Sequence, residues 1–124
     1  MDELQARIED TVARAASARD GFDARVVYDG FTCQGYAVDA ESPLVQRLTA
    51  AAERVIGRSP DTLASTATTD ARAFALHAGT PAVCFGPYAE AIHGIDARVL
   101  LPSVLQTAQS LALFIDGWCG LEPG

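Results

Sequence analysis

The chain has 124 residues, of which 49% are hydrophobic, and its formal net charge at pH 7 is −7. This length is enough for one ordinary domain, and no apolar run reaches the ~20 residues that a membrane-spanning helix needs. The acidic charge argues against nucleic-acid binding, which needs a basic surface to neutralise phosphates. The acidic N-terminus lacks the features of a signal peptide, and three widely spaced cysteines suit a reducing compartment. We therefore expect a cytoplasmic protein that binds neither nucleic acid nor membrane.

The first part of the chain predicts one helix and one extended segment. Apolar residues recur at helical spacing over residues 3–18, where Leu4, Ile8 and Val12 share one face. Residues 24–38 are rich in β-branched and aromatic residues, which favour a strand. Residues 39–42 are a plausible boundary between this part and the rest of the chain.

From residue 43 onward the order of elements indicates an α/β fold. Ser42 and Pro43 open a helix that ends at Gly57, and a short strand is expected within residues 58–68. A helix over residues 70–78 is followed by an apolar run at 81–85, which predicts a buried strand of a parallel sheet containing a buried Cys84. Residues 99–101 could pair briefly before a final helix that opens at Pro102 and ends near residue 117. Helices that alternate with apolar strands are typical of a mainly parallel sheet covered by helices.

His93 is the strongest candidate for a metal ligand or general base. It follows the Gly86-Pro87 turn, and ligands of open α/β sheets bind beyond the carboxyl ends of strands. An ordinary polar loop residue is the alternative. A catalytic zinc site needs about three protein ligands, and only Asp70, Asp96 and His77 could join His93. We expect His77 on a helix surface instead.

Asp70, Arg72 and Gly86 each allow a structural and a functional interpretation. Thr69 or Asp70 could cap the helix that begins there. Arg72 could bind a substrate carboxylate or form an ion pair with Asp70 or Asp96. Gly86 could serve a turn or let a ligand approach the backbone. The residues by themselves predict an acidic α/β protein with a candidate site at one loop.

Three motifs in order resemble the C-terminal part of the M20 metallopeptidase family, which includes acetylornithine deacetylase, succinyl-diaminopimelate desuccinylase and aminoacylases. They are Thr69-Asp70-Ala71-Arg72, the Gly-Thr-Pro-Ala-Val-Cys-Phe-Gly-Pro run at residues 79–87, and Ile92-His93-Gly94-Ile95-Asp96. The resemblance extends over essentially the whole chain, through Ser42-Pro43-Leu44-Val45 and the closing residues 114–120. It implies that residues 1–38 are the last helix and strand of a lid domain, which usually mediates dimerisation. Residues 42–124 would then be the closing part of a three-layer αβα zinc-hydrolase catalytic domain.

The same resemblance implies a function and a set of site residues. Members hold two zinc ions and hydrolyse the amide bond of N-acylated amino acids or related small acids, using a metal-bridging water that a glutamate deprotonates. His93 would bind a metal ion, Arg72 and Gly86 would contact the substrate, and Asp70 would support the site. The other four ligands, the glutamate and a histidine from the partner's lid lie upstream in the family. The resemblance therefore implies no catalytic residue within this chain and a homo-oligomer.

Two departures from the family pattern affect these expectations. Met1 stands where a family member would be in mid-course, so we expect a truncated product. We expect it to be inactive alone, because one matching histidine is too few for a site with two metal ions. Ala97 stands where a glutamate often follows the histidine motif, which changes the support of the loop but not the ligand. The alternative function is a non-catalytic, self-associating or partner-binding module. A third option is a mononuclear metal site built from His93 of two copies.

Overall fold

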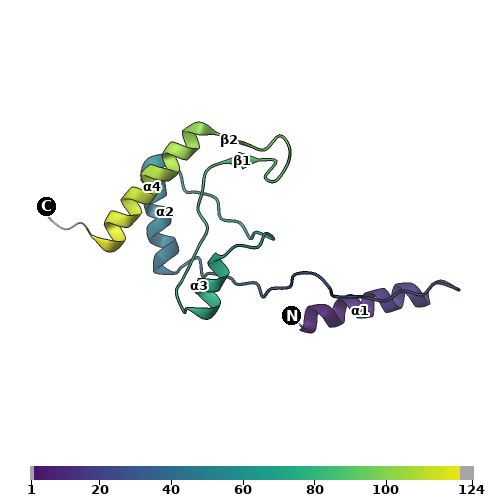
Figure 1. The fold of residues 1–124 in the computed structure, drawn as a ribbon. Coiled ribbons are helices and arrows are strands. Elements are labelled where there is room, and N and C mark those ends of the chain that lie inside the picture. The colour runs from purple at the N-terminus through teal and green to yellow at the C-terminus, as the bar shows by residue number, and fades with distance from the viewer. Residues whose placement is uncertain (1, 121–124) are drawn as a thin grey trace. The chain divides into compact units, whose positions relative to one another are not determined.

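The computed structural model describes residues 2–120, which form two compact units that divide between Gly35 and Tyr36 (Figure 1). The described elements are α1 (Asp2–Ser17), α2 (Pro43–Ile56), α3 (Ala71–His77), β1 (Ala89–Glu90), β2 (Arg98–Val99) and α4 (Leu101–Cys119). The four predicted helices all form close to their expected bounds, and the mixed α/β content agrees with the predicted class. None of the helices in residues 2–120 is long and apolar enough to cross a membrane.

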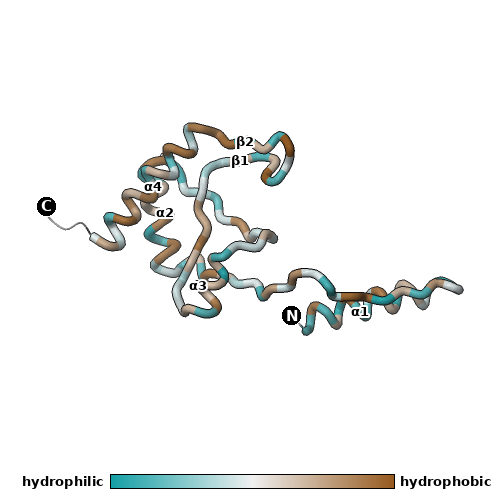
Figure 2. The backbone as a smooth tube through the Cα atoms, in the orientation of Figure 1, coloured by the Kyte–Doolittle hydropathy of each residue, from teal (hydrophilic) through white to brown (hydrophobic). Residues whose placement is uncertain are grey.

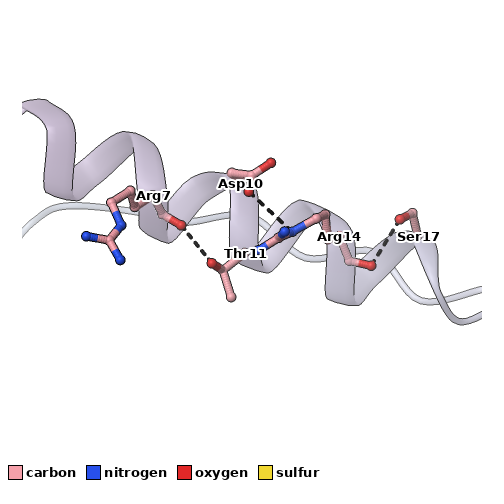
Figure 3. A network of polar contacts seen from close by, with 5 residues as sticks. All are labelled: Arg7, Asp10, Thr11, Arg14 and Ser17. Atoms are coloured by element: carbon pink, nitrogen blue, oxygen red, sulfur yellow. Dashed lines mark hydrogen bonds and ion pairs between the residues drawn. The ribbon is translucent and has the colours of Figure 1, made fainter.

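The first unit consists of α1 and a segment that turns back along it (Figure 1). Figure 3 shows the polar surface of α1, where the Thr11 hydroxyl donates to the Arg7 carbonyl at 2.8 Å and Arg14 lies 3.2 Å from Asp10. The returning segment is tied to the helix by the Tyr28 hydroxyl, which donates to the Gln5 carbonyl at 3.1 Å. Such exposed contacts each contribute only tenths of a kcal/mol, about 0.3–0.5 for an i,i+4 ion pair.

The strand predicted over residues 24–38 does not form. Its β-branched and aromatic composition favours an extended chain, but a strand exists only when a second segment completes its ladder. In the described part of the chain no segment pairs with these residues as a strand. The prediction of a strand here is therefore wrong for this chain by itself, and the assignment of residues 1–38 to a lid domain stays a prediction.

The second unit is held together by α2 and α4, which pack against each other (Figure 1). Its buried side chains are few and mostly small: Ala52 and Ser110 have no exposed surface, and Leu48 and Ala51 are nearly buried. Small residues let two helix backbones approach closely, so the packing of α2 on α4 depends on them. At the end of α4 the Arg47 guanidinium donates to the Gly117 carbonyl at 2.8 Å and lies 5.5 Å from the centre of the Trp118 ring.

The predicted parallel sheet is absent from the described residues. Residues 81–85 form an apolar stretch, visible in Figure 2 between α3 and β1, but it is not a strand, and neither is any part of residues 58–68. The described sheet consists of β1 and β2 alone and is antiparallel. Parallel strands need neighbours and cover on both faces, which residues 2–120 do not supply to this stretch. Cys84 is accordingly exposed and not buried as predicted.

Candidate functional site

His93 lies on the loop that joins β1 to β2. The two strands pair Ala89 with Val99 and Glu90 with Arg98, and the Leu100 amide donates to the Tyr88 carbonyl at 2.9 Å just beyond them. Residues 99–101 were expected to pair briefly, and Val99 does so. A short antiparallel hairpin, and not the end of a parallel strand, therefore carries the candidate ligand.

The loop is folded by its own backbone. The Gly94 amide donates to the Ala91 carbonyl at 2.7 Å, and the Ala97 amide donates to the Gly94 carbonyl at 3.2 Å. Ala91 and His93 have φ angles of 50° and 68°, in the left-handed region that few residues other than glycine adopt. These turns place His93 on an exposed part of the loop.

A carboxylate at the base of the loop makes contacts in two directions. Glu90 Oε2 accepts a hydrogen bond from Arg98 Nε at 2.6 Å, and Glu90 Oε1 accepts one from the Tyr88 hydroxyl at 3.0 Å. The hydrogen bond to Glu90, with the negative charge of that carboxylate, raises the pKa of Tyr88. The motifs in the sequence did not point to these three residues. The sequence signal that could have indicated them is the opposite charge of Glu90 and Arg98, which flank the loop on either side.

Beside the loop lies a shallow hollow of about 310 Å³. Its lining combines the His93 loop with both strands: Ala89, Glu90, Ile92, His93, Ala97, Arg98 and Val99. The hollow therefore brings the predicted ligand together with an acid and a guanidinium that sequence reasoning did not connect to it.

The other predicted site residues lie on or near α3. Thr69, and not Asp70, caps this helix, because the Thr69 hydroxyl accepts from the Ala71 amide at 3.0 Å while the Asp70 side chain makes no capping bond. Asp70 is exposed, and Arg72 is half-buried in the first turn. The Thr69 hydroxyl is also 3.5 Å from Cys84 Sγ, which joins the start of α3 to the 81–85 segment.

Gly86 lies in an exposed part of the chain between that segment and β1. Its φ is outside the left-handed region, and a Cβ atom there would meet nothing within 4 Å. The backbone conformation therefore does not require glycine at this position. His77 is the last residue of α3 and is exposed, so it lies on the helix surface as expected.

No group of three or more histidine, cysteine, aspartate or glutamate side chains in residues 2–120 is arranged to hold a metal ion. Asp70, Asp96 and His77 do not join His93 in such a group. The described residues thus offer one candidate ligand and do not fit a complete metal centre, which needs about three protein ligands at a catalytic zinc.

Residues 7–117 match the profile of peptidase family M20/M25/M40, so the chain belongs to this family. The family is one of hydrolases that are generally metal-dependent. A search of curated proteins finds no match to the chain.

Proposed function

We propose that this chain supplies the C-terminal part of a zinc-dependent amidohydrolase that acts on N-acylated amino acids or related small acids. In this proposal the chain belongs to the closing portion of a three-layer catalytic domain, works in the cytoplasm as a homo-oligomer and is inactive alone. His93 is a metal ligand, Arg72 and Gly86 contact the substrate, and Asp70 supports the site.

The observation that carries the proposal is the exposed placement of His93 on the β1–β2 loop, together with the family match over residues 7–117. A histidine on an exposed loop can bind a metal ion that is also bound by ligands from outside this chain. Two zinc ions require more ligands than the described residues arrange together. The proposal therefore assigns the other ligands, and the glutamate that acts as general base, to protein outside this chain.

The ligand role of His93 is tested by zinc titration of the purified chain, using calorimetry. The chain has two histidines, so His77→Ala is a matched control for His93→Ala. We expect weak or moderate zinc binding that is lost in His93→Ala and kept in His77→Ala. Loss in both variants, or in neither, would contradict a specific role of His93.

The lack of activity in the isolated chain is tested separately. We expect no hydrolysis of N-acetyl amino acids by the zinc-treated chain. A bridging water is activated by two metal ions, and His93 by itself provides too few ligands to hold two ions. Turnover by the purified chain that follows its elution profile and disappears in His93→Ala would overturn this part of the proposal.

A second candidate function is a non-catalytic module that associates with itself or with a partner protein. Large apolar side chains are exposed to an unusual degree in the second unit, with Leu63 at 81% and Leu101 at 74%. Extended apolar surface on a protein marks an interaction site. This candidate predicts association of the chain through its exposed apolar side chains.

A further inference from the structure

The hairpin that carries His93 is too small to hold its loop through strand pairing alone. It has two residue pairs, Ala89 with Val99 and Glu90 with Arg98, and isolated two-stranded hairpins are at best marginally stable in water. Its loop nevertheless keeps two non-glycine residues, Ala91 and His93, in the left-handed region. Such backbone persists only where surrounding contacts over-determine it.

The side-chain contacts that hold the base of this loop are made by Glu90. One oxygen of its carboxylate binds Arg98 on the opposite strand, through Nε at 2.6 Å, and the other accepts from the Tyr88 hydroxyl at 3.0 Å. Glu90 is the less exposed member of the ion pair, at 41% against 74% for Arg98. A charge-assisted pair across the last residue pair before the loop fixes the separation of the two loop ends.

Tyr88 links this cluster to the first turn of α4. The Tyr88 amide donates to the Ser103 hydroxyl at 2.9 Å, and the Tyr88 carbonyl accepts from the Leu100 amide at 2.9 Å. The Ser103 hydroxyl in turn donates to the Leu100 carbonyl at 2.6 Å. Contacts therefore run without a break from α4 through Tyr88 and Glu90 to Arg98, at the foot of the loop.

We propose that Glu90, through Arg98 and Tyr88, is a positioning residue that holds the His93 loop in the conformation that presents the imidazole. Glu90 and Arg98 lie in the same hollow as His93, so any displacement of the pair alters both the loop ends and the surroundings of the ring. Only the purpose of this positioning, ligand presentation, rests on the proposed function. The effect on loop conformation is independent of it.

The test compares the full chain with Glu90→Gln and Tyr88→Phe by nuclear magnetic resonance. The Gly94 amide, which donates to Ala91 at 2.7 Å within the loop, reports loop opening through hydrogen exchange, and the His93 ring resonances report its surroundings. We expect Gly94 exchange to become about threefold faster in Glu90→Gln, and less so in Tyr88→Phe, because contacts as exposed as these contribute little each. Asp61→Asn, which removes the exposed Arg58–Asp61 pair at 3.3 Å, is the matched control. Circular dichroism checks that the helices remain.

A charge-reversed double variant, Glu90→Arg with Arg98→Glu, separates pairing from a general structural effect. Slower Gly94 exchange in the double variant than in Glu90→Arg alone supports the proposal. Wild-type exchange and ring resonances in Glu90→Gln, or a double variant that is no better than Glu90→Arg alone, would overturn it.

Zinc titration keeps this proposal distinct from the ligand role of His93. If the wild-type chain binds no zinc while Glu90→Gln still opens the loop, the ligand role fails and the positioning role stands. If zinc binds through His93 and Glu90→Gln changes neither the loop nor zinc affinity, the positioning role fails and the ligand role stands.

Discussion

Tyr88 and Glu90 show at the residue scale how one carboxylate changes the chemistry of its neighbour. The Tyr88 hydroxyl donates to Glu90 at 3.0 Å, and this bond with the charge of the carboxylate raises the pKa of Tyr88 above the ordinary 10.0. The protonated phenol is thus the form that the folded hairpin favours. Its contribution to stability is present below the pKa of the unfolded chain and is lost as pH rises through the higher pKa of the folded chain.

We therefore predict that Glu90→Gln lowers the pKa of Tyr88 toward its ordinary value. The glutamine can still accept a hydrogen bond but carries no charge to oppose the phenolate. The measurement is the tyrosinate absorbance as a function of alkaline pH, with Tyr88→Phe subtracted to isolate this residue from the other two tyrosines. An unchanged titration in Glu90→Gln would show that Glu90 is not the cause.

Two glycines near the candidate site differ in the space available for a side chain. A Cβ atom at Gly94 would lie 2.9 Å from the Ala91 carbonyl oxygen, whereas one at Gly86 would meet nothing within 4 Å. The loop needs glycine at position 94 because the backbone of its own turn comes so close. Gly86 has no such steric reason within the described structure, which leaves its proposed contact with a substrate to be tested.

The same substitution at these two positions is expected to have different effects. Gly94→Ala should disturb the turn, speed hydrogen exchange in the loop and displace the His93 resonances. Gly86→Ala should leave the fold intact or stabilise it by about 0.4–1 kcal/mol, because alanine reduces the entropy of the unfolded chain. Denaturant unfolding and loop exchange measure both. Equal responses of the two variants would contradict the close approach at Gly94.

At the scale of elements, the packing of α2 on α4 depends on small side chains. Ala52 and Ser110 have no exposed surface, and the Ser110 hydroxyl donates to the Gln106 carbonyl at 2.8 Å within its own helix. Because that hydroxyl is satisfied locally, the contact is one of shape and requires no polar partner from α2. The interface therefore has little tolerance for added volume.

We predict that Ala52→Leu destabilises the second unit by about 1–3 kcal/mol, the usual cost of overpacking. Ala50→Leu is the control, since Ala50 lies on the same helix but is exposed. Thermal or denaturant unfolding followed by circular dichroism gives the difference. The prediction fails if Ala52→Leu is as stable as the control.

The elements also differ in how far the sequence could predict them. The helices were predictable because their hydrogen bonds are local and their ends carry local signals, such as Gly57 with φ 79° after α2. The strands at 24–38 and 81–85 were not, because a strand depends on a distant partner. The sequence also could not decide which residue caps α3. Thr69 and Asp70 are adjacent and both can cap a helix, and the geometry of the turn places the Thr69 hydroxyl, and not the Asp70 side chain, at the helix start.

At the scale of the whole molecule, the described residues bury few hydrophobic side chains and leave many large ones exposed. The described residues bury three hydrophobic side chains, Leu48, Ala51 and Ala52, while large ones such as Leu63, Ile95 and Leu101 are exposed. A core of this size leaves a chain marginally stable by itself. The physical consequence is a tendency to cover these surfaces with other protein.

We predict that the purified chain associates in a concentration-dependent manner. Light scattering at rising protein concentration measures this, and replacing exposed Leu101 and Leu105 with glutamine should shift the equilibrium toward monomer, because both lie one turn apart on α4. A stable monomer at high concentration would count against both the homo-oligomer and the interaction module.

By itself the sequence determined the four helices, the mixed α/β class and the likeness to the M20 family through its motifs at residues 69–96. These depend on local periodicity, capping and residue order, which a single chain carries in full. Only the tertiary structure decided that residues 81–85 stay outside a sheet, that the His93 loop sits on a two-stranded antiparallel hairpin, and that Glu90, Arg98 and Tyr88 converge at its foot. Those features depend on contacts between segments that are distant in the sequence, and residue types and spacing do not specify such contacts.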